Sequence, residues 1–238
     1  MNAPSNLRIK LFADGADRAG MLDLYRRPLI RGFTTNPTLM RNAGVTDYEG
    51  FARDIVRAIP DRPISFEVLA DEFPEMERQA VKIASWGENV YVKIPVTNTW
   101  GEPSRGLIER LSRAGLHLNV TALLTLDHVH EVAPCLADGP SSYVSVFAGR
   151  VADTGVDPVP LMAAAVEALR PYRNVELIWA SPREILNVFQ AASVGCHVIT
   201  VTHEMLRKLS LAGKDLREYS LETVRMFYDD GQKAGYAL

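Results

Sequence analysis

Cysteine is scarce in this chain, and the two residues present, Cys135 and Cys196, form neither a CxxC pair nor a spacing typical of a metal site. Isolated thiols of this kind are typical of proteins whose cysteines stay reduced. Long apolar runs are also missing, and the first residues, MNAPSNLRIK, lack the apolar core of a signal peptide. We therefore expect a cytoplasmic protein that does not enter a membrane.

A strong charge of one sign is absent as well. The formal net charge is −3 over 238 residues, which argues against a general nucleic-acid-binding surface. Neither a GxGxxG sequence nor a Walker-type loop follows any predicted strand, which removes the usual signature of a nucleotide site. No low-complexity segment, charge block or long linker divides the chain. We expect one domain over residues 1–238.

What the chain does contain is a rhythm of short apolar segments separated by stretches of helical length. The predicted strands are Ile9–Asp14, Gly32–Asn36, Ile64–Leu69, Val90–Val96, His117–Leu123, Tyr143–Gly149, Val175–Ser181 and His197–Thr202. Helical patterns lie between them, as in Phe73–Trp86, Asp157–Tyr172 and Ser181–Gly195. This alternation favours an α/β fold, a single (β/α)8 TIM barrel, over an open doubly wound sheet. A further helix is predicted at about residues 216–234, beyond the eighth unit.

Apolar and polar side chains also alternate along the predicted strands. Odd and even positions of a strand point to opposite faces, and we call residues on one face residues of the same parity. In a barrel, one face of each strand points inward and the other meets the helices. Apolar residues such as Val92 and Ile94 occupy one parity, which we expect to face the helices. The opposite parity collects Asp14, Glu67, Lys93, Asn119, Thr121 and Ser145; Thr34 and Asn36 share one parity on the second strand, and Ser181 ends the seventh. Most lie toward the carboxyl ends of the strands, where barrel enzymes build active sites.

Lys93, in the strand VYVKIPV, is the residue that most specifically indicates a type of chemistry. Burial disfavours an ammonium ion and makes the neutral amine available as a nucleophile, although a lysine can also reach solvent along its own methylenes. Beside inward carboxylates, such an amine suits attack on a ketone, formation of a Schiff base and cleavage of the neighbouring carbon–carbon bond. Asp14 and Glu67 are the candidate proton-transfer groups. Thr121 could hold the catalytic water.

The remaining polar residues suit a hydroxylated, anionic substrate. Asn36 and Asn119 could bind substrate hydroxyls. Arg150, in FAGR, and Arg183, in ASPRE, follow the sixth and seventh strands, and each alone could equally be a solvated surface residue. Ser181 before Pro182 fits a helix N-cap, and a helix N-terminus beside two arginines suits a phosphate.

Other polar clusters point to ordinary structural roles. DHVH, Asp127–His130, has metal-ligand residue types, but it falls on a predicted helix, where a polar face is the favoured interpretation. His197 and His203 flank the eighth strand and are interpreted as capping or packing residues. We expect no metal site.

Taken in order, these stretches resemble the transaldolase family, barrel enzymes that work through a Schiff base. The matching stretches are FAD with Asp14, TTNP with Asn36, SFEV with Glu67, VKIPVT with Lys93, LNVTALLT with Asn119 and Thr121, SVFAGR with Ser145 and Arg150, and ASPRE with Ser181 and Arg183. By this resemblance, Lys93 would carry the Schiff base, Asp14 would handle the C4-hydroxyl proton, and Glu67 with a water held by Thr121 would transfer protons. The implied substrate pocket comprises Thr34, Asn36, Asn119, Ser145, Phe147, Arg150, Ser181 and Arg183.

The resemblance further implies sugar-phosphate substrates, no metal or organic cofactor, and a homo-oligomer in which the C-terminal helix packs on a neighbouring subunit. It fits the pentose phosphate pathway or a more specialised sugar pathway. The short fructose-6-phosphate aldolases of the family, which release free dihydroxyacetone, typically carry glutamine where Glu67 stands and tyrosine where Phe147 stands. The pair found here favours transfer over simple cleavage. A barrel that binds sugar phosphates without catalysis is the third hypothesis.

Some segments depart from the family's pattern. The loop Thr97–Ser104 is longer than in the short aldolases, and the seventh strand reads WASP, so that Trp179 and Pro182 could reshape the acceptor pocket. These departures leave the identity of the sugar open.

Overall fold

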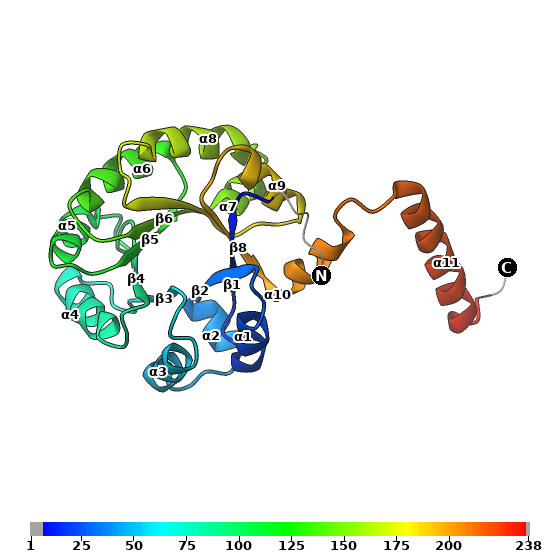
Figure 1. Ribbon diagram of the computed structural model, residues 1–238, viewed down its shortest axis with the longest axis horizontal. Coiled ribbons are helices and arrows are strands. Elements are labelled where there is room, and N and C mark those ends of the chain that lie inside the picture. The colour runs from blue at the N-terminus through cyan, green and yellow to red at the C-terminus, as the bar shows by residue number, and fades with distance from the viewer. Residues whose placement is uncertain (1–6, 237–238) are drawn as a thin grey trace.

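Eight parallel strands close into a barrel in chain order in the computed structural model, which describes residues 7–236 (Figure 1). The strands are β1 Lys10–Asp14, β2 Ile30–Thr34, β3 Ile64–Glu67, β4 Val90–Pro95, β5 Leu118–Leu123, β6 Ser142–Val146, β7 Val175–Trp179 and β8 Val198–Thr202. Pairing of β1 with β8 completes the ring, which confirms the predicted (β/α)8 barrel and removes the open sheet from consideration.

Helices surround the ring. They are α1 Arg18–Tyr25, α2 Pro37–Asn42, α3 Tyr48–Ala58, α4 Phe73–Ala84, α5 Arg105–Arg113, α6 Leu126–Val132, α7 Ala148–Asp153, α8 Pro158–Leu169, α9 Leu186–Ser193, α10 His203–Lys208 and α11 Leu216–Ala234, with short 3₁₀ turns η1 Ala133–Leu136 and η2 Leu209–Leu211. Asp127 and His130 do lie on a helix, α6. Among residues 7–236, no helix combines the length and the apolar character needed to cross a membrane.

Helix α11 has the predicted bounds. Asp215 begins it by accepting hydrogen bonds from the backbone N–H groups of Arg217 and Glu218, and Gly235 ends it in the left-handed conformation with φ 66°. The helix projects away from the barrel (Figure 1), and none of its residues is buried. Its apolar side chains are therefore not buried against the described part of the chain.

The parity predicted for the strands matches the packing. Outward residues such as Phe66, Val92 and Val120 belong to the large core between strands and helices. Inside the barrel, a separate cluster is formed by Phe12, Tyr143, Ile178, Ala180 and Val198, with Tyr91 and Phe147 packed against it. Phe12 and Tyr91 share the inward parity with Asp14 and Lys93 further along the same strands. Aromatic rings and aliphatic side chains thus fill the barrel interior beneath the polar groups at the carboxyl ends of the strands.

Strand boundaries differ from the prediction at the carboxyl ends. The second strand runs from Ile30 to Thr34 instead of Gly32 to Asn36. Asn36 leaves the sheet because its side chain caps α2, accepting a hydrogen bond from the backbone N–H of Leu39 at 2.9 Å, and Pro37 favours the first helical position. The third strand stops at Glu67 because the N–H groups of Leu69 and Ala70 bond to the Gln79 side chain instead of a neighbouring strand.

The prediction that Ser181 caps a helix is wrong. The helix of the seventh unit, α9, begins at Leu186, and Ser181 has φ 59°, a left-handed conformation that an N-cap residue does not adopt. The intervening loop is held by Asn187, whose side-chain oxygen accepts a hydrogen bond from the N–H of Arg183 at 2.8 Å. No helix N-terminus therefore opens at Ser181.

Candidate active site

A cavity of about 390 Å³ opens at the carboxyl ends of the strands. We call it the carboxyl-end cavity. Its lining comprises Asp14, Thr34, Asn36, Pro37, Thr38, Leu39, Glu67, Lys93, Asn119, Thr121, Ala122, Ser145, Phe147, Arg150, Ala180, Ser181 and Thr200. Every site residue predicted from the sequence is in this set except Arg183. Parallel strands bring these residues together because their carboxyl ends converge on one mouth of the barrel.

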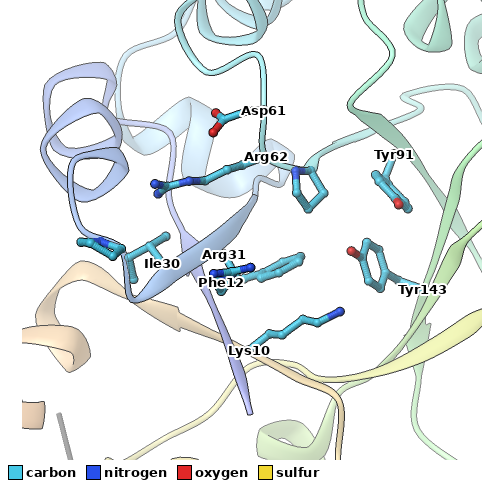
Figure 2. Close-up of a pocket in the computed structure, with 10 residues that line it drawn as sticks. Lys10, Phe12, Ile30, Arg31, Asp61, Arg62, Tyr91 and Tyr143 are labelled. Carbon is cyan, nitrogen blue, oxygen red and sulfur yellow. The ribbon is translucent and has the colours of Figure 1, made fainter. Parts of the chain in front are cut away.

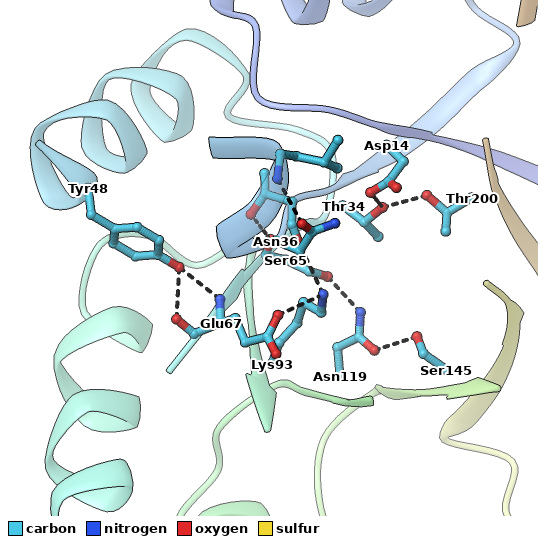
Figure 3. A network of polar contacts seen from close by, with 12 residues as sticks. Asp14, Thr34, Asn36, Tyr48, Ser65, Glu67, Lys93, Asn119, Ser145 and Thr200 are labelled. Carbon is cyan, nitrogen blue, oxygen red and sulfur yellow. Dashed lines mark hydrogen bonds and ion pairs between the residues drawn. The ribbon is translucent and has the colours of Figure 1, made fainter. Parts of the chain in front are cut away.

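Lys93 lies at the centre of this cavity, on β4 (Figure 3). Its side chain is only 8% exposed, so it does not reach bulk solvent. The Nζ atom donates a hydrogen bond to the backbone carbonyl of Thr35 at 2.9 Å and lies 3.1 Å from Oε2 of Glu67. The amine is therefore held between two acceptors, one of which can take up a proton.

Glu67 is fixed at the end of β3 by a tyrosine from outside the barrel. The hydroxyl of Tyr48, on α3, donates to the backbone carbonyl of Glu67 at 2.8 Å and accepts from its backbone N–H at 2.9 Å. The Tyr48 ring packs edge-on against Phe66, and burial raises the pKa of Tyr48 far above its ordinary range. The neutral Tyr48 hydroxyl both donates and accepts a hydrogen bond, and it thereby holds the backbone of Glu67 beside Lys93.

Asp14 ends β1 on the other side of Lys93. Oδ1 of Asp14 accepts a hydrogen bond from the hydroxyl of Thr34 at 2.7 Å, and that hydroxyl also contacts the hydroxyl of Thr200 (Figure 3). Burial raises the pKa of Asp14 above its ordinary value, while the Thr34 hydrogen bond and the nearby Lys93 and His203 charges lower it. A carboxyl group with a raised pKa suits a proton-transfer role near neutral pH.

Asn119 is fully buried on β5, and both ends of its amide are hydrogen-bonded. The Nδ2 group donates to the hydroxyl of Ser65 at 2.9 Å, and Oδ1 accepts from the hydroxyl of Ser145 at 2.7 Å. This row of hydrogen-bonded side chains crosses the barrel interior from β3 to β6 (Figure 3). It holds the polar face of the cavity rigid without using any charged group.

Thr121 has a buried hydroxyl with no hydrogen-bonding partner in the described protein. It lines the carboxyl-end cavity, and the residue after it, Ala122, has φ 65° at an irregularity in the pairing of β5 with β6. Positive φ is costly for alanine, and such strain gathers at functional sites. Buried hydroxyls almost always bond to protein, water or ligand, so this one is available to a molecule in the cavity.

The two arginines are placed differently. Arg150 lines the carboxyl-end cavity, is exposed, and lies over the Phe147 ring at 5.6 Å from the ring centroid. Arg183 is outside the lining: its Nε donates to Asp153 at 2.7 Å, and its Nη1 contacts the carbonyl and hydroxyl of Ser181, each at 3.0 Å. Arg150 is thus the guanidinium open to an anion, whereas Arg183 holds the Ser181 loop.

A second cavity, of about 490 Å³, opens at the opposite mouth of the barrel, between Lys10, Phe12, Arg62, Tyr91 and Tyr143 among others (Figure 2). Although it is larger, Lys10 is neutralised by Glu176 at 2.7 Å. The amino-terminal mouth of a barrel contributes stability in this fold class. The smaller carboxyl-end cavity, with its buried amine and two carboxyl groups, is therefore the candidate active site.

Comparison with known proteins identifies the family of this chain. Residues 11–238 match the family described as Transaldolase/Fructose-6-phosphate aldolase. This chain belongs to that family. A "Probable transaldolase" from Thermoanaerobacter sp. is 31% identical over 230 residues, which cover 95% of this chain and 99% of that protein. Another, from Dehalococcoides mccartyi, is 32% identical over 202 residues, 84% of this chain and 90% of that one.

Solved structures show the same fold at lower identity. Dihydrodipicolinate synthase from Rhodopseudomonas palustris superposes with a TM-score of 0.57 at 12% identity, covering 97% of this chain and 82% of that chain. A monomeric dihydrodipicolinate synthase variant gives a TM-score of 0.61 at 10% identity. These likenesses show the barrel fold alone.

Among the residues that the sequence analysis of this transaldolase-family site missed are Thr200, Ser65 and Tyr48, whose side chains hydrogen-bond to predicted site residues. Thr200 sits at the inward parity of HVITVT, the same parity as the other cavity residues, so the signal existed but was masked by the surrounding β-branched residues. Ser65 lies on β3 two residues before Glu67, on the same face of the strand, and its hydroxyl accepts a hydrogen bond from Asn119. Tyr48 lies on α3, 19 residues before Glu67, and no local pattern links the two residues.

Proposed function

We propose that this protein is a transaldolase that transfers a dihydroxyacetone unit from a ketose phosphate to an aldose acceptor through a Schiff base on Lys93. The observation that carries the proposal is the buried amine of Lys93, 3.1 Å from the Glu67 carboxylate, in the cavity that Asp14 also lines. An amine that must lose a proton before it attacks needs an acceptor within reach, and Glu67 is that acceptor.

The reaction begins when Nζ of Lys93 attacks the ketone carbon of the donor. The carbinolamine loses its hydroxyl as water, with a proton supplied by Glu67 through the water that the Thr121 hydroxyl would hold. Asp14 takes the proton of the C4 hydroxyl, the C3–C4 bond breaks, and its electron pair moves into the iminium to give an enamine. An aldehyde leaves. The enamine carbon then attacks the acceptor aldehyde, whose oxygen takes the proton back from Asp14, and hydrolysis of the new iminium releases the product ketose and frees Lys93.

Phe147 favours transfer over release. A phenylalanine lines the site next to Arg150 and offers no hydroxyl that would orient a water toward the enamine. An enamine that is slow to be protonated persists until an aldehyde arrives. Free dihydroxyacetone production, the aldolase alternative, would need that protonation to be fast.

Borohydride trapping tests this function. The protein is incubated with fructose 6-phosphate, reduced, and examined by intact and peptide mass spectrometry. We expect a reduced dihydroxyacetone adduct on the peptide carrying Lys93, and aldose phosphate formation that continues past one turnover only when an acceptor aldehyde is present. Continued turnover without acceptor would assign the aldolase activity instead. An adduct on another lysine would overturn the site, and binding without any adduct across a panel of ketose phosphates would indicate a non-catalytic barrel.

We also propose that α11 packs against a second copy of this chain. Its exposed apolar residues include Leu216, Val224, Phe227 and Tyr228, each at least 60% exposed. Exposed apolar residues gathered on a helix that has no buried residue are typical of a surface that contacts another protein. Light scattering is expected to show an oligomer, and the double substitution Val224→Asp with Phe227→Asp is expected to reduce its mass. A monomeric wild-type protein would contradict this.

A further inference from the structure

Three side chains on neighbouring strands form a line that ends at Asp14. Strand β1 lies between β2 and β8, and the line runs from Thr200 on β8 to Thr34 on β2 and from there to Asp14 on β1 (Figure 3). The Thr34 hydroxyl lies 2.7 Å from Oδ1 of Asp14 and 2.5 Å from the Thr200 hydroxyl. Thr34 is 4% exposed and Thr200 5% exposed, so the line is closed to bulk solvent along most of its length.

The number of protons fixes the direction of each hydrogen bond. A threonine hydroxyl has one proton to donate and can accept as well. While Asp14 is a carboxylate it only accepts, so Thr34 must give its proton to Asp14. The contact between the hydroxyls then requires Thr200 to donate to Thr34. Hydrogen bonds aligned in this way polarise one another, and the negative charge at the end of the line benefits from both donors.

We propose that Thr200 is a positioning residue for the proposed transaldolase reaction: by donating to Thr34, it stabilises the carboxylate of Asp14 and keeps it aimed as the base that takes the substrate hydroxyl proton. The inference rests on the proposed function. When Asp14 takes up that proton on its other carboxylate oxygen, Thr34 can still donate to Oδ1, so this hydrogen bond is kept in both charge states of Asp14.

The other groups facing Asp14 define what Thr200 must add. Burial raises the pKa of Asp14, and the influences opposing it are the Thr34 hydrogen bond and the charges of Lys93, from β4, and His203, from α10. Burial lowers the pKa of His203, so its ring is neutral near pH 7 and contributes little positive charge there. Lys93 loses its ammonium form whenever it attacks a ketone. The hydroxyl line is the partner of Asp14 that persists throughout the cycle.

Removing the Thr200 hydroxyl is therefore expected to raise the pKa of Asp14. The carboxylate is the form that accepts a proton, and it predominates above that pKa. In Thr200→Val, which keeps the shape of the side chain, the acid limb of the kcat/KM profile for the donor ketose is expected to move up by about half to one pH unit. Thr200→Ser keeps the hydroxyl and is expected to retain the wild-type limb.

The measurement compares both variants with wild type over the acid limb, with thermal unfolding as a check on folding. Thr200→Ala also lacks the hydroxyl and is expected to shift the limb as valine does, which provides a second variant if valine impairs folding. If the acid limb of the kcat/KM profile is unchanged in a folded Thr200→Val or Thr200→Ala protein, Thr200 serves only in packing and the proposal is wrong. Borohydride trapping on Lys93 is measured in parallel. Absence of an adduct in the wild type would overturn the proposed function itself, whatever the pH profiles of the variants show.

Discussion

Replacing Lys93 by methionine is expected to lower the transfer rate by about 10⁴-fold or more and to abolish the reduced adduct, because no other group in the cavity can form an iminium. Methionine resembles lysine in length and lacks the amine. The rest of the lining, including Asp14 and Arg150, is unchanged, so binding of the ketose phosphate is expected to persist. Steady-state kinetics and isothermal calorimetry on the same preparation separate the two effects.

The matched control is Lys208→Met, on α10. Lys208 is 59% exposed and pairs with Glu204 on the surface of its own helix, at 3.1 Å. Its replacement is expected to leave activity and trapping at wild-type values, since exposed pairs of this kind contribute little to stability. A Lys93→Met protein that still turns over at a tenth of the wild-type rate or better would rule out covalent catalysis at Lys93 and direct attention to Asp14 and Glu67.

The fold and the centre of the site were predictable because their signals are local. Alternation within VYVKIPV places Lys93 opposite Val92 and Ile94, and in a closed barrel that choice leaves only the interior for the amine. The same two-residue period places Asp14 and Glu67 on inward faces. Strand order then follows from chain order in a barrel, so residues more than a hundred positions apart in the sequence converge without any specific long-range information.

The parts that escaped prediction depend on contacts between segments. Tyr48 reaches Glu67 from α3, and its ring packs against Phe66. The pattern of residues within α3 does not predict either contact. The Ser181 loop was mistaken for a helix start because Ser-Pro fits that pattern locally. In the folded protein, Arg183 joins Ser181 to Asp153 instead, and Ser181 adopts positive φ. Tertiary partners at the strand ends decide these conformations.

Gly149 is expected to be the backbone position least tolerant of substitution near the site. It is the second residue of α7, and a Cβ atom added there would lie 1.5 Å from the carbonyl oxygen of Ser181 and 2.6 Å from its carbonyl carbon. Both are backbone atoms, so a side-chain rotation cannot relieve the overlap. Gly149→Ala is expected to lower the free energy of unfolding by about 3 kcal/mol, the upper end of the range for overpacking, in a denaturant titration.

Gly106→Ala is the control, because Gly106 is also the second residue of a helix that follows a barrel strand, α5 after β4. A Cβ atom there would meet only Nη1 of Arg110, at 3.5 Å, an ordinary contact. Neither glycine has positive φ, so the two substitutions differ in available space and not in backbone strain. Alanine at 106 is expected to stabilise the protein by about 0.4–1 kcal/mol, because it lowers the conformational entropy of the unfolded chain. If Gly149→Ala also unfolded at or above the wild-type midpoint, the close approach of α7 to Ser181 would not exist in solution. If it is destabilised as expected, the loss of transfer activity should exceed the loss of folded protein, because the displaced segment carries Ser181 in the carboxyl-end cavity.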